Sequence, residues 1–101
     1  MAEGGGDEGS GERRVWLFHG EGNRRFASGV FGDEAAGLQW VARHGLTGVL
    51  TEYQVGDGCY DQAVQQGRFS NTKPHHGSAD HVAGFSPGLD HIHVRDGQRD
   101  A

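Results

Sequence analysis

Apolar residues along the chain alternate with polar ones in some segments and recur at helical spacing in others. The continuous apolar run at residues 15–18 predicts a central strand, and residues 26–31 predict a second strand that forms a hairpin with it. Residues 47–55 alternate cleanly between the two faces of a strand, and residues 90–95 do so again. This pattern predicts four strands.

Two segments between these strands carry helix signals. Asp33 is a typical N-cap, an apolar stripe follows it at helical spacing, and Gly45 stands where a left-handed C-cap belongs. A shorter helix is expected after Asp57 as its N-cap, and it should end at Gly67. Residues 70–88 are polar and predict a long loop.

The elements follow the order ββαβαβ, which is typical of an α+β fold. A helix between the second and third strands allows a right-handed parallel crossover, so we expect a mixed four-stranded sheet with two helices packed on one face. Residues 13–96 should form this single domain. Residues 1–12 are glycine-rich and acidic and predict a disordered tail, and residues 97–101 predict a frayed C-terminus.

Charge and composition narrow the possible functions. The formal charge of the 101 residues is -5, but residues 1–12 carry four acids and no base, and residues 13–96 carry eight basic and nine acidic residues. A body so close to neutral lacks the positive field that nucleic-acid binding requires. No secretory signal or membrane-length apolar run is present, and the single Cys59 cannot form an internal disulfide. We therefore expect a cytoplasmic protein that binds neither nucleic acid nor membranes.

Several short motifs resemble a known family. The stretches VWLFHGEG, GVF, W-x3-H-x-LTG-x-LTEY and YD-x-A together are similar to a family of small bacterial single-domain proteins of unknown function. The resemblance covers about residues 15–94. It implies a compact α+β domain and supplies no catalytic residues.

Histidines are concentrated near the C-terminus, where five of the seven lie in the last twenty-seven residues. His91 and His93 are two apart on a strand and project to the same face, so they could place two imidazoles on one Zn²⁺. A site would need further ligands, for which the candidates are His75, His76, His81 and Asp90. The alternative is that these histidines form the polar outer face of an edge strand.

Other reactive groups are more simply explained by structure. Cys59 at a helix start could be a nucleophile with His19 as its base, but a free cysteine is more often a small buried residue. Residues 20–25 contain the glycines and arginines of an anion site, yet they lead into a strand and not a helix, so we interpret them as a hairpin turn. No catalytic residue and no enzyme class is indicated.

The primary functional hypothesis is a non-enzymatic protein-interaction module, such as a regulator or a toxin-neutralising partner. The predicted loop contains Lys73, His75, His76 and Phe85, and Phe85 could serve as an aromatic anchor for an unknown protein partner. The alternative for Phe85 is that it closes the core. We expect no cofactor other than the zinc considered above, and a monomer or weak homo-oligomer.

Overall fold

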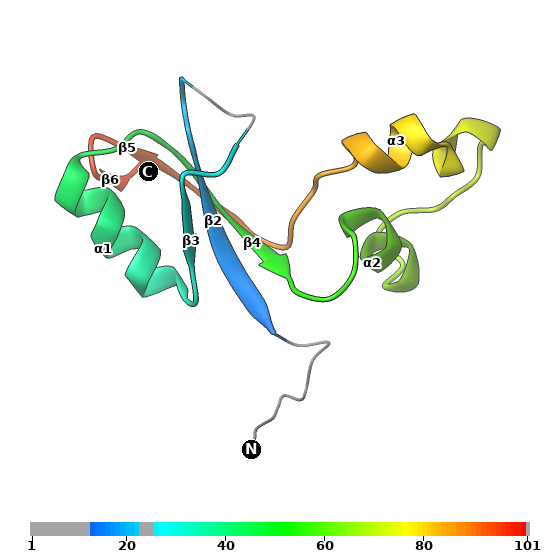
Figure 1. Ribbon diagram of the computed structural model, residues 1–101, viewed down its shortest axis with the longest axis horizontal. Helices are drawn as coiled ribbons and strands as arrows, with labels where there is room; N and C mark the ends of the chain where they lie inside the picture. The colour runs from blue at the N-terminus through cyan, green and yellow to red at the C-terminus, as the bar shows by residue number, and fades with distance from the viewer. Residues whose placement is uncertain (1–12, 23–25, 101) are drawn as a thin grey trace, which may run out of the picture.

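The computed structural model of the protein describes residues 13–22 and 26–100. The chain forms an α+β domain (Figure 1), as the sequence predicts. Its elements in order are β2 (Arg14–Gly20), β3 (Gly29–Phe31), α1 (Glu34–His44), β4 (Gly48–Gln54), α2 (Cys59–Gln65), the 3-10 helix η2 (Pro74–Gly77), α3 (Ala79–Gly84), β5 (His91–Arg95) and β6 (Gln98–Arg99). The predicted tail at residues 1–12 lies outside the described residues.

The described strands form one five-stranded sheet in the order β3-β2-β4-β5-β6, and all neighbouring strands are antiparallel. The predicted mixed four-stranded sheet is therefore wrong in detail. β3 and β4 do run parallel, but β2 pairs with both of them and separates them, so no parallel pair forms. The additional strand β6 lies inside the segment for which fraying was predicted.

The first helix confirms the local signals of the sequence. The Asp33 side chain accepts a hydrogen bond of 2.8 Å from the Ala36 amide. Gly45 ends the helix with φ of 64°, and the amide of Leu46 then donates to the carbonyl of Val41 at 3.1 Å. These caps position α1 across one face of the sheet.

The main core lies between α1 and that face. Its buried members are Trp16 and Phe18 of β2, Val41 of α1, Leu50 of β4 and Val94 of β5. Val41 and Leu50 have no exposed surface. Burial of side chains this large is the dominant favourable contribution to folding.

The rest of the chain departs from the prediction in three ways. The N-cap of α2 is Gly58 and not Asp57, and it makes no side-chain capping bond. The predicted loop at residues 70–88 contains η2 and α3, which begin at Pro74 and after the capping side chain of Ser78. The composition of this segment is polar because the two helices are short and mostly exposed.

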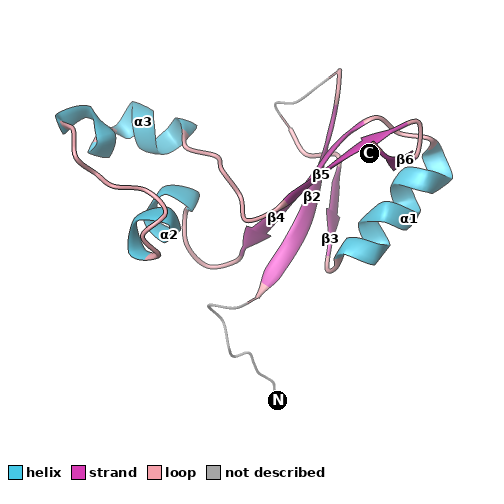
Figure 2. Ribbon diagram, turned by 180° about the vertical axis from the view of Figure 1, so that it is seen from behind, coloured by secondary structure: helices cyan, strands magenta, loops and turns pink. Residues whose placement is uncertain are grey.

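The helices also do not share one face of the sheet. Figures 1 and 2 show α2 and α3 together beyond the end of β4, away from α1. The predicted pair of helices on one face is therefore wrong, since α1 alone covers the main core. None of the helices in residues 13–22 and 26–100 covers the opposite face of the sheet over most of its strands (Figures 1 and 2).

Candidate functional site

The sheet face opposite α1 is the first candidate site, and we call it the open face. Side chains alternate along a strand, so the neighbours of buried Trp16, Leu50 and Val94 must point away from α1. The open face therefore carries Val15, Leu17, His19, Val30, Val49, Thr51, Tyr53, His91 and His93.

The centre of the open face is apolar. Leu17 lies between Val30 and Thr51 in the strand register, and Val49 lies between His19 and His93. Val30 is 65% exposed, and Phe26 just before this edge strand is 69% exposed. Large apolar side chains with this much exposure often mark an interaction surface when they form one patch.

Basic and imidazole groups border this centre. Arg95 is paired with Asp100 through Nε at 3.3 Å. No described carboxylate is paired with His19, His91 or His93, which therefore remain available as hydrogen-bond donors.

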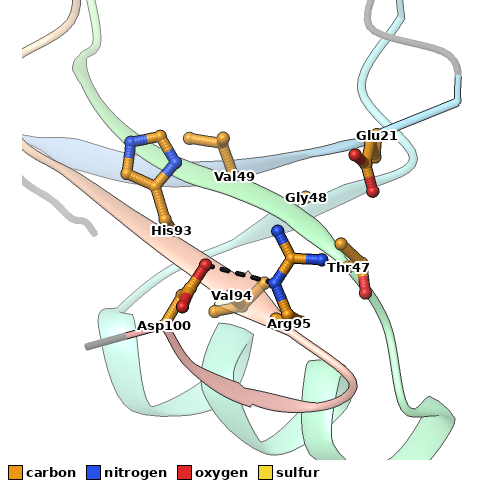
Figure 3. A pocket seen from close by; sticks show the side chains of 8 residues that line it. All are labelled: Glu21, Thr47, Gly48, Val49, His93, Val94, Arg95 and Asp100. Atoms are coloured by element: carbon orange, nitrogen blue, oxygen red, sulfur yellow. Dashed lines mark hydrogen bonds and ion pairs between the residues drawn. The ribbon is translucent and has the colours of Figure 1, made fainter.

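A small polar pocket lies at one end of the open face (Figure 3). Its volume is about 60 Å³, room for a few water molecules. Its lining is Glu21, Thr47, Gly48, Val49, His93, Val94, Arg95 and Asp100. Arg95 pairs with Asp100 in this lining, and no hydroxyl or thiol of the described lining residues is hydrogen-bonded to a base, so the pocket offers no arrangement for nucleophilic catalysis.

The second candidate site is a cluster of rings among α2, η2 and α3, which we call the ring cluster. Phe69 is its centre, and the ring centroids of Tyr60, His76, His81 and Phe85 lie 4.9 to 5.9 Å from that of Phe69. Aromatic pairs at such distances stabilise beyond their buried area. The ring cluster is a small second core that holds the three short helices together.

The predicted interaction residues belong to this region. Phe85 is half-buried against Phe69 and Tyr60, while Lys73 and His75 are exposed and His76 is half-buried. The ring of Phe85 is therefore engaged within the chain. A role for Phe85, Lys73, His75 and His76 in binding a partner stays a prediction.

Hydrogen bonds define the protonation state of His76. Its Nδ1 accepts the amide protons of Thr72 and Lys73, both at 3.2 Å, so the proton of the neutral ring must be on Nε2. Partial burial, followed by the positive charges of His75, His81 and Lys73, lowers the pKa of His76. The environment thus favours a neutral imidazole.

The structure separates the five C-terminal histidines into two groups. His75, His76 and His81 meet in the ring cluster, with ring centroids 4.6 to 5.9 Å apart. His91 and His93 form a separate pair on β5 at 5.1 Å.

Neither group presents a formed metal site. Within residues 13–22 and 26–100, no three or more His, Cys, Asp or Glu side chains are placed to hold a metal ion. A metal-bound histidine usually donates its second ring N–H, whereas Nδ1 of His76 accepts. We assign none of the three ring-cluster histidines as a ligand, and zinc binding through His91 and His93 stays a prediction.

The structure does not bring Cys59 and His19 together. His19 pairs with Val49 near the start of β4. Cys59 comes after the other end of β4, and at the rise of a strand that end lies about 16 Å from Val49. Cys59 instead lies near Tyr53, and burial followed by the Cys59 thiol raises the pKa of Tyr53. Residues 23–25 of the predicted turn lie outside the described residues, but the hairpin of β2 and β3 is confirmed.

Sequence reasoning missed the open face and the burial of Gln62. Alternation in β2 and β4 identified two faces but not which one a helix would cover. Gln62 is only 6% exposed, and its Nε2 donates to the carbonyls of Gln54 and Asp57 at 3.2 and 3.3 Å. Nothing in the polar sequence around Gln62 signals this role.

Fold and surface together define a small α+β domain whose antiparallel sheet is covered by a helix on one side. Residues 15–100 match the family model described as Domain of unknown function (DUF7710), and the chain belongs to this family. No curated protein and no solved structure matches the chain. The predicted resemblance to an uncharacterised domain family is confirmed, and a bacterial origin stays a prediction.

None of the helices within residues 13–22 and 26–100 has the length and apolar character needed to cross a bilayer.

Proposed function

We propose that the protein is a non-enzymatic interaction module whose open face binds an acidic protein partner. The observation that carries this proposal is the one-sided covering of the sheet. α1 buries Trp16, Phe18 and Leu50, while no helix in the described part of the chain covers Leu17 and Val30 on the opposite side. An apolar sheet face normally packs on another layer, and a partner would supply it.

The chemistry of the border identifies the partner. His19, His91 and His93 make no ion pair with a carboxylate among the described residues, so acidic side chains around an apolar centre would complement them. A second copy of this chain would present the same open face, whose side chains on the described strands include no carboxylate. The border therefore favours a different, acidic protein over self-association.

The proposal includes the narrower functions considered above. A regulator or a toxin-neutralising protein acts by covering a surface of its partner, and the open face suits such a role. The polar pocket and the position of Cys59 support no competing catalytic function. A cytoplasmic location is part of this proposal.

Introducing a negative charge on the open face tests the proposal. The wild-type protein and the variants Val30→Glu and His91→Glu serve as baits. Each captured protein is purified, and its affinity for each purified bait is then measured. Val64→Glu is the matched control, since Val64 in α2 is 37% exposed and lies outside the open face.

We expect an acidic partner whose affinity falls at least tenfold with Val30→Glu and His91→Glu and is unchanged with Val64→Glu. Binding should also weaken with salt, because surface charges are screened. A partner that binds all variants equally, or the absence of any partner that binds purified protein, would overturn the proposal. Dimerisation of the wild type that Val30→Glu abolishes would assign the face to a second copy instead.

A further inference from the structure

The hydrogen bonds of His76 make its position sensitive to a proton. Nδ1 accepts the amides of Thr72 and Lys73, which lead into η2. Protonation of Nδ1 would convert this acceptor into a donor, and both bonds would then be lost. The two amides would be left facing an N–H group.

The groups around His76 also disfavour a positive charge. His75 in η2, His81 in α3 and Lys73 before η2 face it, and the ring of Phe69 lies at 4.9 Å. The carboxylates of α2 and α3, Asp61 and Asp80, are exposed. Among the described residues, no ion pair joins a carboxylate to these imidazoles. An imidazolium at position 76 would therefore be uncompensated.

His81 of α3 packs in the same ring cluster. Its Nδ1 is buried and has no hydrogen-bond partner among the described residues. The ring lies between Phe69, Phe85 and Tyr60 at 5.5 to 5.9 Å.

We infer that α2, η2 and α3 form a pH-sensitive element, in which protonation of His76 releases η2 and α3 from Phe69. The inference rests on the hydrogen bonds of His76 and not on the open face, so it does not depend on the proposed partner. We call the arrangement in which η2 and α3 pack on Phe69 the closed state, and the released arrangement the open state. Release would expose the rings of Phe69 and Phe85, which are half-buried in the closed state. The domain would thus present a second apolar surface only in acid.

The direction follows from proton linkage. The pKa of His76 is lowered in the closed state from its ordinary value of 6.5, so the open state binds the proton more readily. The closed state is fully favoured above about pH 6.5, and it loses stability as the pH falls from there through the lowered pKa. One linked proton changes the equilibrium constant between the closed and open states by up to about tenfold per pH unit.

Nuclear magnetic resonance on the full chain provides the test. The ring nitrogen shifts of His76 should show an unprotonated Nδ1 at pH 7.5 and a titration midpoint below 6.5. Between pH 7.5 and 5.5, the protection factors of the Thr72 and Lys73 amides, corrected for intrinsic exchange, should fall at least tenfold. The amide of Leu50 in β4 should keep its protection, because it belongs to the main core.

Two variants complete the test. His76→Asn places an acceptor oxygen near the position of Nδ1 but does not titrate, so protection at residues 72 and 73 should become independent of pH. His91→Asn, at an exposed position of β5, should behave as the wild type. Loss of protection with acid in His76→Asn, or none in the wild type, would overturn the inference. If the His76→Asn variant does not form the closed state at pH 7.5, the titration of wild-type His76 remains as a test. A titration midpoint of its ring at or above pH 6.5 would overturn the inference.

Discussion

Gly48 at the start of β4 leaves the space that the ring of Phe18 occupies in the core. A Cβ atom at position 48 would lie 2.8 Å from Cζ of Phe18, and it would also meet the carbonyl oxygen of His19. The two strands can pair at normal spacing with Phe18 buried only because residue 48 has no side chain. This contact links the sheet register to the packing of the core.

Gly48→Ala should therefore be destabilising. Overpacking against backbone and a buried ring costs about 1–3 kcal/mol, and we expect a loss of about 2 kcal/mol in the free energy of unfolding measured with urea. Gly32→Ala is the matched control, because a Cβ there meets nothing within 4 Å. Equal stability of the two variants would contradict the packing described for Gly48.

Gln62 should contribute to stability through its two hydrogen bonds to backbone carbonyls. Gln62→Ala leaves the carbonyls of Gln54 and Asp57 without this donor, and we expect a loss of about 1–2 kcal/mol. Gln62→Glu should cost more, since a carboxylate would face two carbonyl oxygens. Urea unfolding at pH 7.5 measures both, and a Glu variant as stable as the wild type would show that Gln62 does not make these bonds.

Tyr53 should make stability depend on alkaline pH. Burial, followed by the nearby Cys59 thiol, raises the pKa of Tyr53 above its ordinary value of 10.0. The folded state then holds the phenolic proton longer, so this contribution is present below pH 10 and is lost as the pH rises through the raised pKa.

Comparison with Tyr53→Phe isolates this effect. The variant lacks the hydroxyl that donates to the carbonyl of Ser86 at 3.2 Å, and it cannot ionise. Urea midpoints from pH 8 to 11 should fall more steeply for the wild type than for Tyr53→Phe. Parallel curves would indicate that the hydroxyl ionises equally in both states.

Zinc addition tests the remaining metal hypothesis. The geometry supplies His91 and His93 as a close pair on β5 and, among the described residues, no third ligand beside them. Two ligands bind weakly compared with the three or four of a zinc site. We expect stoichiometric Zn²⁺ to raise the melting temperature by less than about 1 °C, because weak binding stabilises little. A rise of several degrees that His91→Ala removes would instead support a zinc module.

Local signals in the sequence determined much of the chain. The Asp33 and Gly45 caps and the apolar stripe between them were enough to place α1, because capping and helical periodicity act within a few residues. Alternation likewise predicted that Val94 points inward and His93 outward. The hairpin of β2 and β3 followed from two apolar runs separated by a turn.

Only the tertiary structure decided which strands pair and what covers them. The position of β2 between β3 and β4 depends on contacts distant in sequence, and so does the choice of the face that α1 covers. η2 and α3 are too short for periodicity to reveal, and they are held by rings from separate segments around Phe69. The five histidines looked like one group in the sequence, but their partition between the ring cluster and β5 depends on where the chain between them runs in space.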